Sequence, residues 1–402
     1  MKIFILNSGS SSVKFKLINF YGKDFYVLCK GQIERIGISD MKLEYVNYRG
    51  QSFEKKYEVL TYSEGIQIII SMLIDTKYGC IDNLKEIDAI GHRVVHGGER
   101  FKVPVIIDKE AILGIKSCIS MAPLHNPANL DGILACQDLF PEIPQVAVFD
   151  TSFHHTIPPE AYLYGLPYKL YQKYGIRKYG FHGISHQYVS EKAAEILKVE
   201  AIKLKTVSCH LGNGASIAAI NHGMSIDTSM GFTPLDGLLM GTRCGEIDPA
   251  IIPFLMYKED MTGKQVYRYL NKESGLLGLS GISGDFRDIE KAAIEGDERA
   301  VRALNAVTYR VGKFIGSYLV AMQGIDCIVF TAGIGENSSY IRKKICEWLD
   351  VFGVKLNLES NEKGTNDRLI STEDSKIKVL VIKTNEEYII ARETFKLCSS
   401  II

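Results

Sequence analysis

The sequence has no surplus of charge of either sign, because Lys plus Arg and Asp plus Glu both number 47 among its 402 residues. No bulk field therefore favours nucleic acid or anionic lipid, and any anion-binding site must be local. Long apolar runs are also missing, since the most apolar window, residues 66–74, is too short to span a bilayer. We expect a protein that binds neither nucleic acid nor membranes.

Paired cysteines and a secretory leader are absent as well. The nine cysteines are odd in number and form no CxxC motif, which is typical of free or buried thiols in a reducing compartment. The N-terminus enters a strand pattern at once, without the basic region and cleavage site of a signal peptide. These features predict a soluble, cytoplasmic protein, and its length predicts two or three domains.

Two stretches share a strand, a polar glycine turn and a second strand. The first, residues 2–18, has Asn-Ser-Gly-Ser-Ser-Ser at its turn, followed by Lys14, but it lacks the GxxxxGK[ST] and GxGxxG patterns. The second, residues 207–220, has Gly-Asn-Gly-Ala-Ser at its turn. In such turns, N–H groups and hydroxyls can converge on a phosphate, although each turn alone could belong to an ordinary hairpin. The pair, half a chain apart, predicts two similar halves that grip a nucleotide across a cleft.

Two predicted strands carry polar residues at or near their ends. Residues 89–98 read as a buried strand, in which alternation places Arg93 and Val95 on one face. Arg93 could hold a short carboxylate whose alkyl tail meets Val95, or it could simply pair with a neighbouring acid. Asp150 follows the strand 145–149, and ligands of open α/β sheets bind at such carboxyl ends.

The second half contains two candidate residues in glycine-rich segments. His182 lies between two glycines, and His186 follows four residues later without the glutamate of HExxH. We therefore favour a loop histidine in a cleft, or a structural histidine, over a zinc ligand. Arg243 also stands in a loop with glycines on both sides.

Two later segments are further candidates for ligand contacts. The glycine turn at residues 331–337 resembles an adenine-binding loop, because missing side chains let a base lie against the backbone. Thr384 opens the last predicted helix as a T-x-x-E capping box. That box leaves Glu386 as either a helix-dipole charge or a metal ligand.

Taken together, the motifs resemble the acetokinase family, within the superfamily of acetate and sugar kinases, Hsp70 and actin. The resemblance runs almost end to end, and its blocks in order are more specific than any one of them. They are NSGSSSVK at 7–14, GHRVVHGG at 91–98, PLHNPAN at 123–129, FDTSFH at 149–154, YGFHGISH at 179–186, HLGNGAS at 210–216, GTRCGEIDPA at 241–250, GIGEN at 333–337 and TNEE at 384–387. One departure is Glu246, where we expect the family to have aspartate more often.

The resemblance implies roles for particular residues. The implied catalytic residues are Asp150, His182, Arg243, Arg93 and Asn213. The implied acyl-substrate residues are Arg93, Val95, Leu124, Phe181 and Pro234. The implied nucleotide-binding residues are Ser10, Ser12, Lys14, His210, Leu211, Gly212, Asn213, Gly214, Asp285, Phe286, Arg287, Gly333, Ile334, Gly335, Glu336 and Asn337. The implied metal ligands are Asn7 and Glu386.

We therefore expect an α/β protein of two ribonuclease H-like (actin-like ATPase) domains, with a duplicated βββαβαβα core and an interdomain cleft. Residues 1–150 and 386–402 would form the N-terminal domain, and residues 151–385 the nucleotide-binding domain. The resemblance implies Mg²⁺- or Mn²⁺-dependent transfer of a phosphoryl group from ATP to acetate, giving ADP and acetyl phosphate, in a homodimer. The alternatives are a propionate or butyrate kinase of the same family and, in a different class, an actin- or Hsp70-like switch ATPase.

Overall fold

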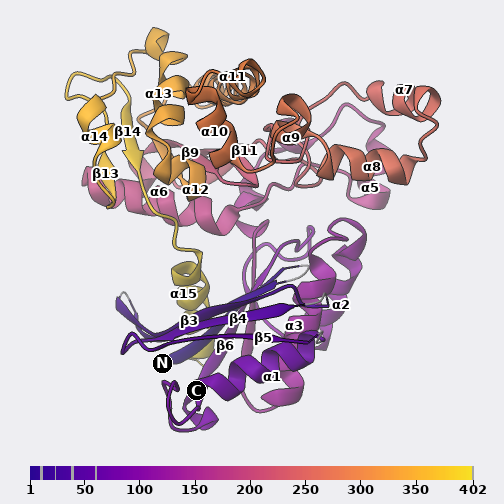
Figure 1. The fold of residues 1–402 in the computed structure, drawn as a ribbon, viewed down its shortest axis with the longest axis vertical. Coiled ribbons are helices and arrows are strands. Elements are labelled where there is room, and N and C mark those ends of the chain that lie inside the picture. The colour runs from indigo at the N-terminus through magenta and orange to yellow at the C-terminus, as the bar shows by residue number, and fades with distance from the viewer. Residues whose placement is uncertain (10–11, 23, 38–39, 59–60, 401–402) are drawn as a thin grey trace. The chain divides into compact units, whose positions relative to one another are not determined.

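Two mixed β-sheets organise the chain, one in each of two compact units (Figure 1). The computed structural model describes residues 1–9, 12–22, 24–37, 40–58 and 61–400. The first unit comprises residues 1–153 and 385–402, and the second comprises residues 154–384. Among the described residues, no helix combines the length and the apolarity that crossing a bilayer requires.

The first unit is built on a sheet of strand order β5-β4-β3-β2-β1-β6-β8-β7. Its strands are β1 Lys2–Ser8, β2 Ser12–Tyr21, β3 Asp24–Glu34, β4 Met41–Asn47, β5 Ser52–Tyr57, β6 Ala89–Val94, β7 Val105–Ile106 and β8 Gln145–Phe149. Its helices are α1 Tyr62–Leu73, α2 Lys109–Ser117, α3 Asn126–Leu139 and α15 Glu386–Cys398, with 3₁₀ turns at Leu84–Glu86 and Cys118–Ser120. A further 3₁₀ turn, Ser152–Thr156, leads into the second unit.

The second unit is built on a sheet of strand order β11-β10-β9-β12-β14-β13. Its strands are β9 Lys205–Leu211, β10 Ala215–Asn221, β11 Met224–Thr228, β12 Cys327–Thr331, β13 Arg368–Leu369 and β14 Lys378–Val381. Its helices are α4 Pro159–Tyr162, α5 Tyr168–Tyr174, α6 Gly183–Leu197, α7 Ile251–Lys258, α8 Gly263–Lys272, α9 Gly275–Ser280, α10 Phe286–Ile294, α11 Glu298–Ala321, α12 Ala332–Asn337, α13 Ser339–Glu347 and α14 Leu358–Glu362, with 3₁₀ turns at Ala201–Lys203 and Asp350–Phe352.

The two sheets share one core topology. In the first, β1 pairs antiparallel with β2 and parallel with β6, and β6 pairs parallel with β8. In the second, β9 pairs antiparallel with β10 and parallel with β12, and β12 pairs parallel with β14. The predicted α/β class with a repeated core is therefore confirmed. Because parallel strands of one sheet end at the same edge, each unit gathers the residues after three strands at one place.

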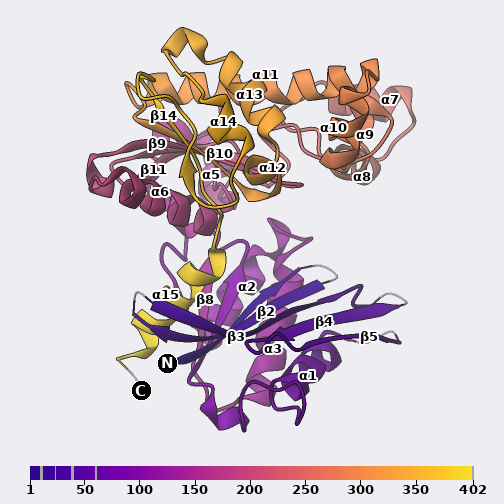
Figure 2. The same ribbon diagram turned by 60° about the vertical axis from the view of Figure 1, so that its left-hand side comes forward.

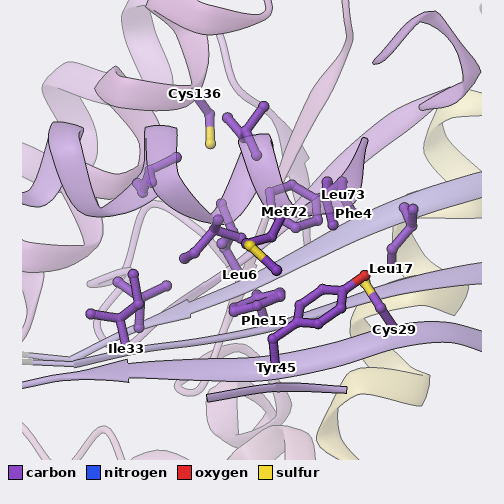
Figure 3. Close-up of a cluster of buried hydrophobic side chains, with 14 of the residues drawn as sticks. Phe4, Leu6, Phe15, Leu17, Cys29, Ile33, Tyr45, Met72, Leu73 and Cys136 are labelled. Atoms are coloured by element: carbon purple, nitrogen blue, oxygen red, sulfur yellow. The ribbon is translucent and has the colours of Figure 1, made fainter. Parts of the chain in front are cut away.

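The core of the first unit fills the space between the sheet and the helices α1 and α3 (Figure 3). Phe4 and Leu6 point to this side of β1, because alternate residues of a strand face opposite ways. They pack with Phe15 and Tyr45 from neighbouring strands, whose rings stack at 6.2 Å. Strand β1 is buried on both faces, since helix α15 covers the other side, as Figure 2 illustrates.

Helix α15 begins one residue later than the sequence predicts. Its N-cap is Asn385, whose side chain accepts a hydrogen bond from the N–H of Tyr388 at 3.1 Å. The predicted capping box starting at Thr384 is therefore wrong. The shift leaves Glu386 as the first residue of the helix, where a carboxylate is favoured by the helix dipole.

Helix α15 can approach β6 closely because residue 91 is glycine. A β-carbon there would lie 2.6 Å from Oγ1 of Thr394 and 2.7 Å from Cγ2 of Ile390. Gly65 in α1 makes a useful contrast, because a β-carbon there would meet Ile33 and Ile36 at 3.7 and 3.8 Å, which is ordinary contact.

We predict that Gly91→Ala lowers the free energy of unfolding by about 1–3 kcal/mol through overpacking against α15. Gly65→Ala should instead raise it by about 0.5–1 kcal/mol, since alanine replaces glycine inside a helix without a clash. Urea unfolding followed by circular dichroism measures both. Equal effects of the two changes would contradict the described packing of α15 on β6.

Candidate active site

Three predicted residues of the first unit meet where β1, β6 and β8 end. Arg93 donates from Nε to Oδ1 of Asp150 at 2.9 Å and from Nη2 to Oδ2 at 2.6 Å, which is a bidentate pair. Its Nη1 donates to Oδ1 of Asn7 at 3.1 Å. Asp150 is buried, whereas the side chain of Arg93 is 18% exposed. The structure thus realises the simpler alternative for Arg93, a pairing with a neighbouring acid, at the edge where ligands bind in such sheets.

Glu386 completes this cluster from the start of α15. Its Oε2 lies 4.0 Å from Nε of Arg93. Burial alone would lower the pKa of Arg93, but Asp150 and then Glu386 hold that pKa above its usual value, so the guanidinium stays charged. Two carboxylates and one amide oxygen therefore surround a single permanent cation.

The loop after β6 is held by two asparagines of α3 that the sequence analysis did not single out. Asn129 accepts from the N–H of Val95 at 3.0 Å and donates to the carbonyl of Ser8 at 2.6 Å, so it ties the end of β1 to the end of β6. Asn126 accepts from the N–H of His96 at 3.1 Å and donates to its carbonyl at 3.0 Å. Both were visible in the PLHNPAN block, but nothing in the spacing predicted their partners.

The residues expected around the acyl group have different surroundings. Strand β6 ends at Val94, so Val95 follows the strand and strand alternation does not place it; it is buried, and Asn129 accepts its N–H. Leu124 is exposed on the first unit. Phe181 is buried and Pro234 half-buried in the second.

The hairpin predicted in the first unit is present, and its binding of phosphate stays a prediction. Strands β1 and β2 pair with Asn7 opposite Lys14, and Ser12 begins β2. Lys14 is exposed. Ser10 lies outside the described residues.

In the second unit, His182 stands at the N-cap of α6 in a left-handed backbone conformation, with φ 55°. That conformation costs a non-glycine residue on the order of 1 kcal/mol, so the surrounding structure must stabilise the backbone at this position. Its Nδ1 lies 2.9 Å from Oγ of Ser216, and its ring stacks on His210 at 4.1 Å. A β-carbon on Gly214 would lie 3.6 Å from Nε2 of His182 and 3.7 Å from Nη1 of Arg243. The histidine and the arginine therefore open onto the same space beside Gly214.

Arg243 is half-buried and, within the part of the chain that the structure describes, has no carboxylate partner. Its Nη1 donates to the carbonyl of Pro234 at 3.1 Å and to Sδ of Met240 at 3.7 Å. Burial lowers the pKa of Arg243, which shows that the protein does not compensate this charge as it compensates Arg93. An arginine keeps its proton at neutral pH, so this side chain is a candidate for binding an anion.

A hollow of about 780 Å³ in the second unit is lined by many of the predicted nucleotide-binding residues. It collects the ends of three segments that are far apart in the sequence: the β9–β10 turn, the start of α10 and helix α12. Its lining residues are Gly212, Asn213, Thr242, Gly284, Asp285, Phe286, Arg287, Glu290, Gly333, Ile334, Asn337 and Ser338. A β-carbon on Gly333 would meet no atom within 4 Å, so this backbone is open to a ligand.

Several predicted nucleotide-binding residues have protein partners. Asp285 caps α10 through the N–H of Arg287 and pairs with its side chain at 2.6 Å, and this contact lowers the pKa of Asp285 to about 2. The predicted glycine turn at 331–337 is wrong, because Ala332–Asn337 forms the short helix α12. Glu336 accepts hydrogen bonds from the N–H groups of Ala332 at 2.9 Å and Thr384 at 3.1 Å, so its carboxylate links α12 to the segment after β14.

No group of three or more His, Cys, Asp or Glu side chains in the described part of the chain is arranged as a metal cage. Mg²⁺ requires less than this, because it takes one or two carboxylates and keeps water or substrate phosphates as its other ligands. The oxygen atoms of Asp150, Glu386 and Asn7 around Arg93 are of the type that this ion prefers.

Comparison with known proteins assigns the family. The family model described as the acetokinase family matches residues 2–392. The chain is 54% identical over 400 residues to an acetate kinase of Halothermothrix orenii and 52% identical over 405 residues to one of Thermotoga maritima, with full coverage of both. The crystal structure of Porphyromonas gingivalis acetate kinase superposes with a TM-score of 0.92 at 44% identity, covering 98% of this chain and 99% of that one. A propionate kinase from Francisella tularensis gives the same values. The chain belongs to the acetokinase family.

We predict that Asn129→Ala destabilises the first unit, because it leaves the buried N–H of Val95 and the carbonyl of Ser8 without partners, at about 1–3 kcal/mol each. Asn83→Ala is the matched control, since Asn83 caps a short surface turn and its loss should cost about 1 kcal/mol or less. Chemical unfolding compares the two variants. A loss no larger for Asn129→Ala than for Asn83→Ala would remove Asn129 from its positioning role.

Proposed function

We propose that this protein is a kinase that reversibly transfers the γ-phosphoryl group of ATP directly to acetate, forming acetyl phosphate and ADP. The observation that carries the proposal is Arg243, an uncompensated guanidinium that opens beside His182 and Gly214. The names of the relatives, which cover the whole chain, support acetate as the acceptor.

The chemistry needs charge neutralisation more than it needs a base. Acetate is already ionised at pH 7, so nothing must remove a proton from it. Two anions must approach in line, and positioned donors stabilise the charge that spreads over the transferring phosphoryl group. In this proposal Arg243 and the Nε2 of His182 contact that group, Asn213 assists from the adjacent turn, and Arg93 orients the acetate carboxylate.

The nucleotide is assigned to the second unit and the metal to the first. The open backbone at Gly333 and the hollow lined by Phe286 and Ile334 suit an adenosine. Asp150, Glu386 and Asn7 would hold Mg²⁺, directly or through water, and the ion would supply charge neutralisation of the phosphates. We keep the proposed domains, residues 1–150 with 386–402 and residues 151–385, with the second as the nucleotide-binding domain.

Homodimer formation and a cytoplasmic location are also proposed. Helix α7 has exposed apolar residues all round its surface, among them Ile251, Phe254 and Tyr257, and a helix of that kind is normally covered. We propose that a second copy of the chain packs against this helix. All nine cysteines are free thiols, which fits a reducing compartment.

Hydroxamate formation from ATP, Mg²⁺, hydroxylamine and a series of short carboxylic acids tests the proposed activity. We expect acetate to give the highest kcat/KM. A clear preference for propionate would favour the second candidate, suggested by the similarity to the Francisella protein. ATP hydrolysis without hydroxamate from any acid would contradict both and favour a switch ATPase.

We predict that Arg243→Ala lowers kcat by about 10²–10³, the range for losing one preorganised donor to the transition state. Arg243→Lys should recover little of this loss, because lysine lacks the planar fork of donors. Arg299→Ala is the control, since Arg299 is an exposed arginine of the same unit that pairs with Asp297. Near-normal kcat in Arg243→Ala would remove the residue from the proposed mechanism.

We predict that Val95→Ala raises the propionate/acetate ratio of kcat/KM several-fold, mainly through a lower KM for propionate. The change removes two methyl carbons, and the extra CH₂ of propionate is worth about 0.8 kcal/mol when buried. Pockets separate such homologues by only about 1–3 kcal/mol, so a shift of preference and not a switch is expected. An unchanged ratio would mean that Val95 does not line the acyl site.

A further inference from the structure

A continuous series of buried hydrogen bonds ends at Nδ1 of His182. The hydroxyl of Ser216 lies 2.9 Å from Nδ1 of His182 and 2.8 Å from Nε2 of His186. Nδ1 of His186 lies in turn 2.8 Å from the hydroxyl of Ser208. His186 and both serines are completely buried.

The series has a direction because each group has a fixed number of protons. Burial, and then the neighbouring rings of His154 and His210, keep the pKa of His186 well below its usual value. The ring of His186 is therefore neutral and carries one N–H. Among the described residues, the hydroxyl of Ser208 has one side-chain hydrogen bond, to this ring, so its proton has an acceptor only if it donates to Nδ1 of His186.

The directions of the other hydrogen bonds in the series follow from that first one. With Nδ1 of His186 accepting, its proton must be on Nε2, which donates to the oxygen of Ser216. Ser216 then has one proton left to donate, and it donates to Nδ1 of His182. The opposite direction would leave the buried proton of Ser208 without an acceptor, and an unsatisfied buried donor is destabilising.

We propose that Ser216 is a positioning residue that fixes His182 in the tautomer with its proton on Nε2, the nitrogen that opens beside Gly214 and Arg243. A neutral His182 then still presents a hydrogen-bond donor to an anion in that space. Stacking on His210, with 21° between the rings, holds the ring plane while Ser216 holds its direction. This inference rests on the proposed function only for its catalytic consequence, because the tautomer itself is a property of the free protein.

The direct test is ¹H–¹⁵N NMR of the full-length protein labelled at its histidine rings, recorded at pH 8. His182→Gln identifies the signals of residue 182. We expect a protonated Nε2 and an unprotonated Nδ1 in the wild type. Ser208→Ala does not touch His182. In this variant we expect both tautomers of His182, because nothing then fixes which groups donate and which accept in the series of hydrogen bonds. A wild-type ring protonated on Nδ1 would overturn the proposal.

The kinetic test compares two matched substitutions of a buried serine by alanine. Ser216→Ala should lower kcat by about 10- to 100-fold, the scale for a misplaced catalytic group, with little change in KM for acetate. Ser225→Ala removes an equally buried serine–histidine bond, 2.7 Å to Nδ1 of His154, which lies outside the series that ends at His182. It should leave kcat unchanged. Equal kcat in the two variants would overturn the role of Ser216, whereas a wild type that makes no acetyl phosphate would defeat the proposed function and leave the NMR result intact.

Discussion

The protein compensates the charges of two arginines in different ways, and the candidate site depends on that difference. In the first unit, Asp150 binds Arg93 in a bidentate pair, and Glu386 stands nearby. In the second, Arg243 is held by a carbonyl and a sulfur atom and has no acid among the described residues. Burying a charge without a partner is costly, so a fold keeps such a group where a ligand supplies the opposite charge. This is the physical basis for proposing Arg243 as the anion-binding residue.

The other features of the second unit follow from that charge. A side chain at position 214 would stand between His182 and Arg243, so glycine there keeps the space open. The left-handed backbone of His182 directs its ring toward this space, and Ser216 and His210 keep it there. The site is thus preorganised by the protein before any ligand arrives, which is the condition under which electrostatic stabilisation is most effective.

Much of this arrangement could be predicted from the sequence, because it depends on local patterns. The two glycine-turn hairpins, the parallel strands and the gathering of Asn7, Arg93 and Asp150 at one sheet edge follow from strand periodicity and from the geometry of parallel sheets. The glycines around Gly333 suggested an open backbone, which the structure has, although within a helix and not a turn.

What could not be predicted depends on tertiary partners. Asn129 pairs with Ser8 of β1 and with Val95, directly after β6, which lie 121 and 34 residues away, and no spacing rule connects them. The motif predicts Glu336 at the nucleotide, but it gives no sign that the carboxylate accepts the backbone N–H groups of Ala332 and Thr384. The serine–histidine chain behind His182 likewise arises only when α6, β9 and β10 pack together.

Equilibrium binding of acetyl phosphate, measured by calorimetry without nucleotide on the wild type and on Arg243→Gln, tests whether the charge of Arg243 binds the anion. The glutamine keeps polar atoms at the site but removes the charge. We predict that the wild type binds the anion and that the variant binds it about tenfold or more weakly, the scale of a hydrogen bond to a charged group. Equal affinity in the two proteins would contradict the assignment of Arg243 as the anion-binding residue.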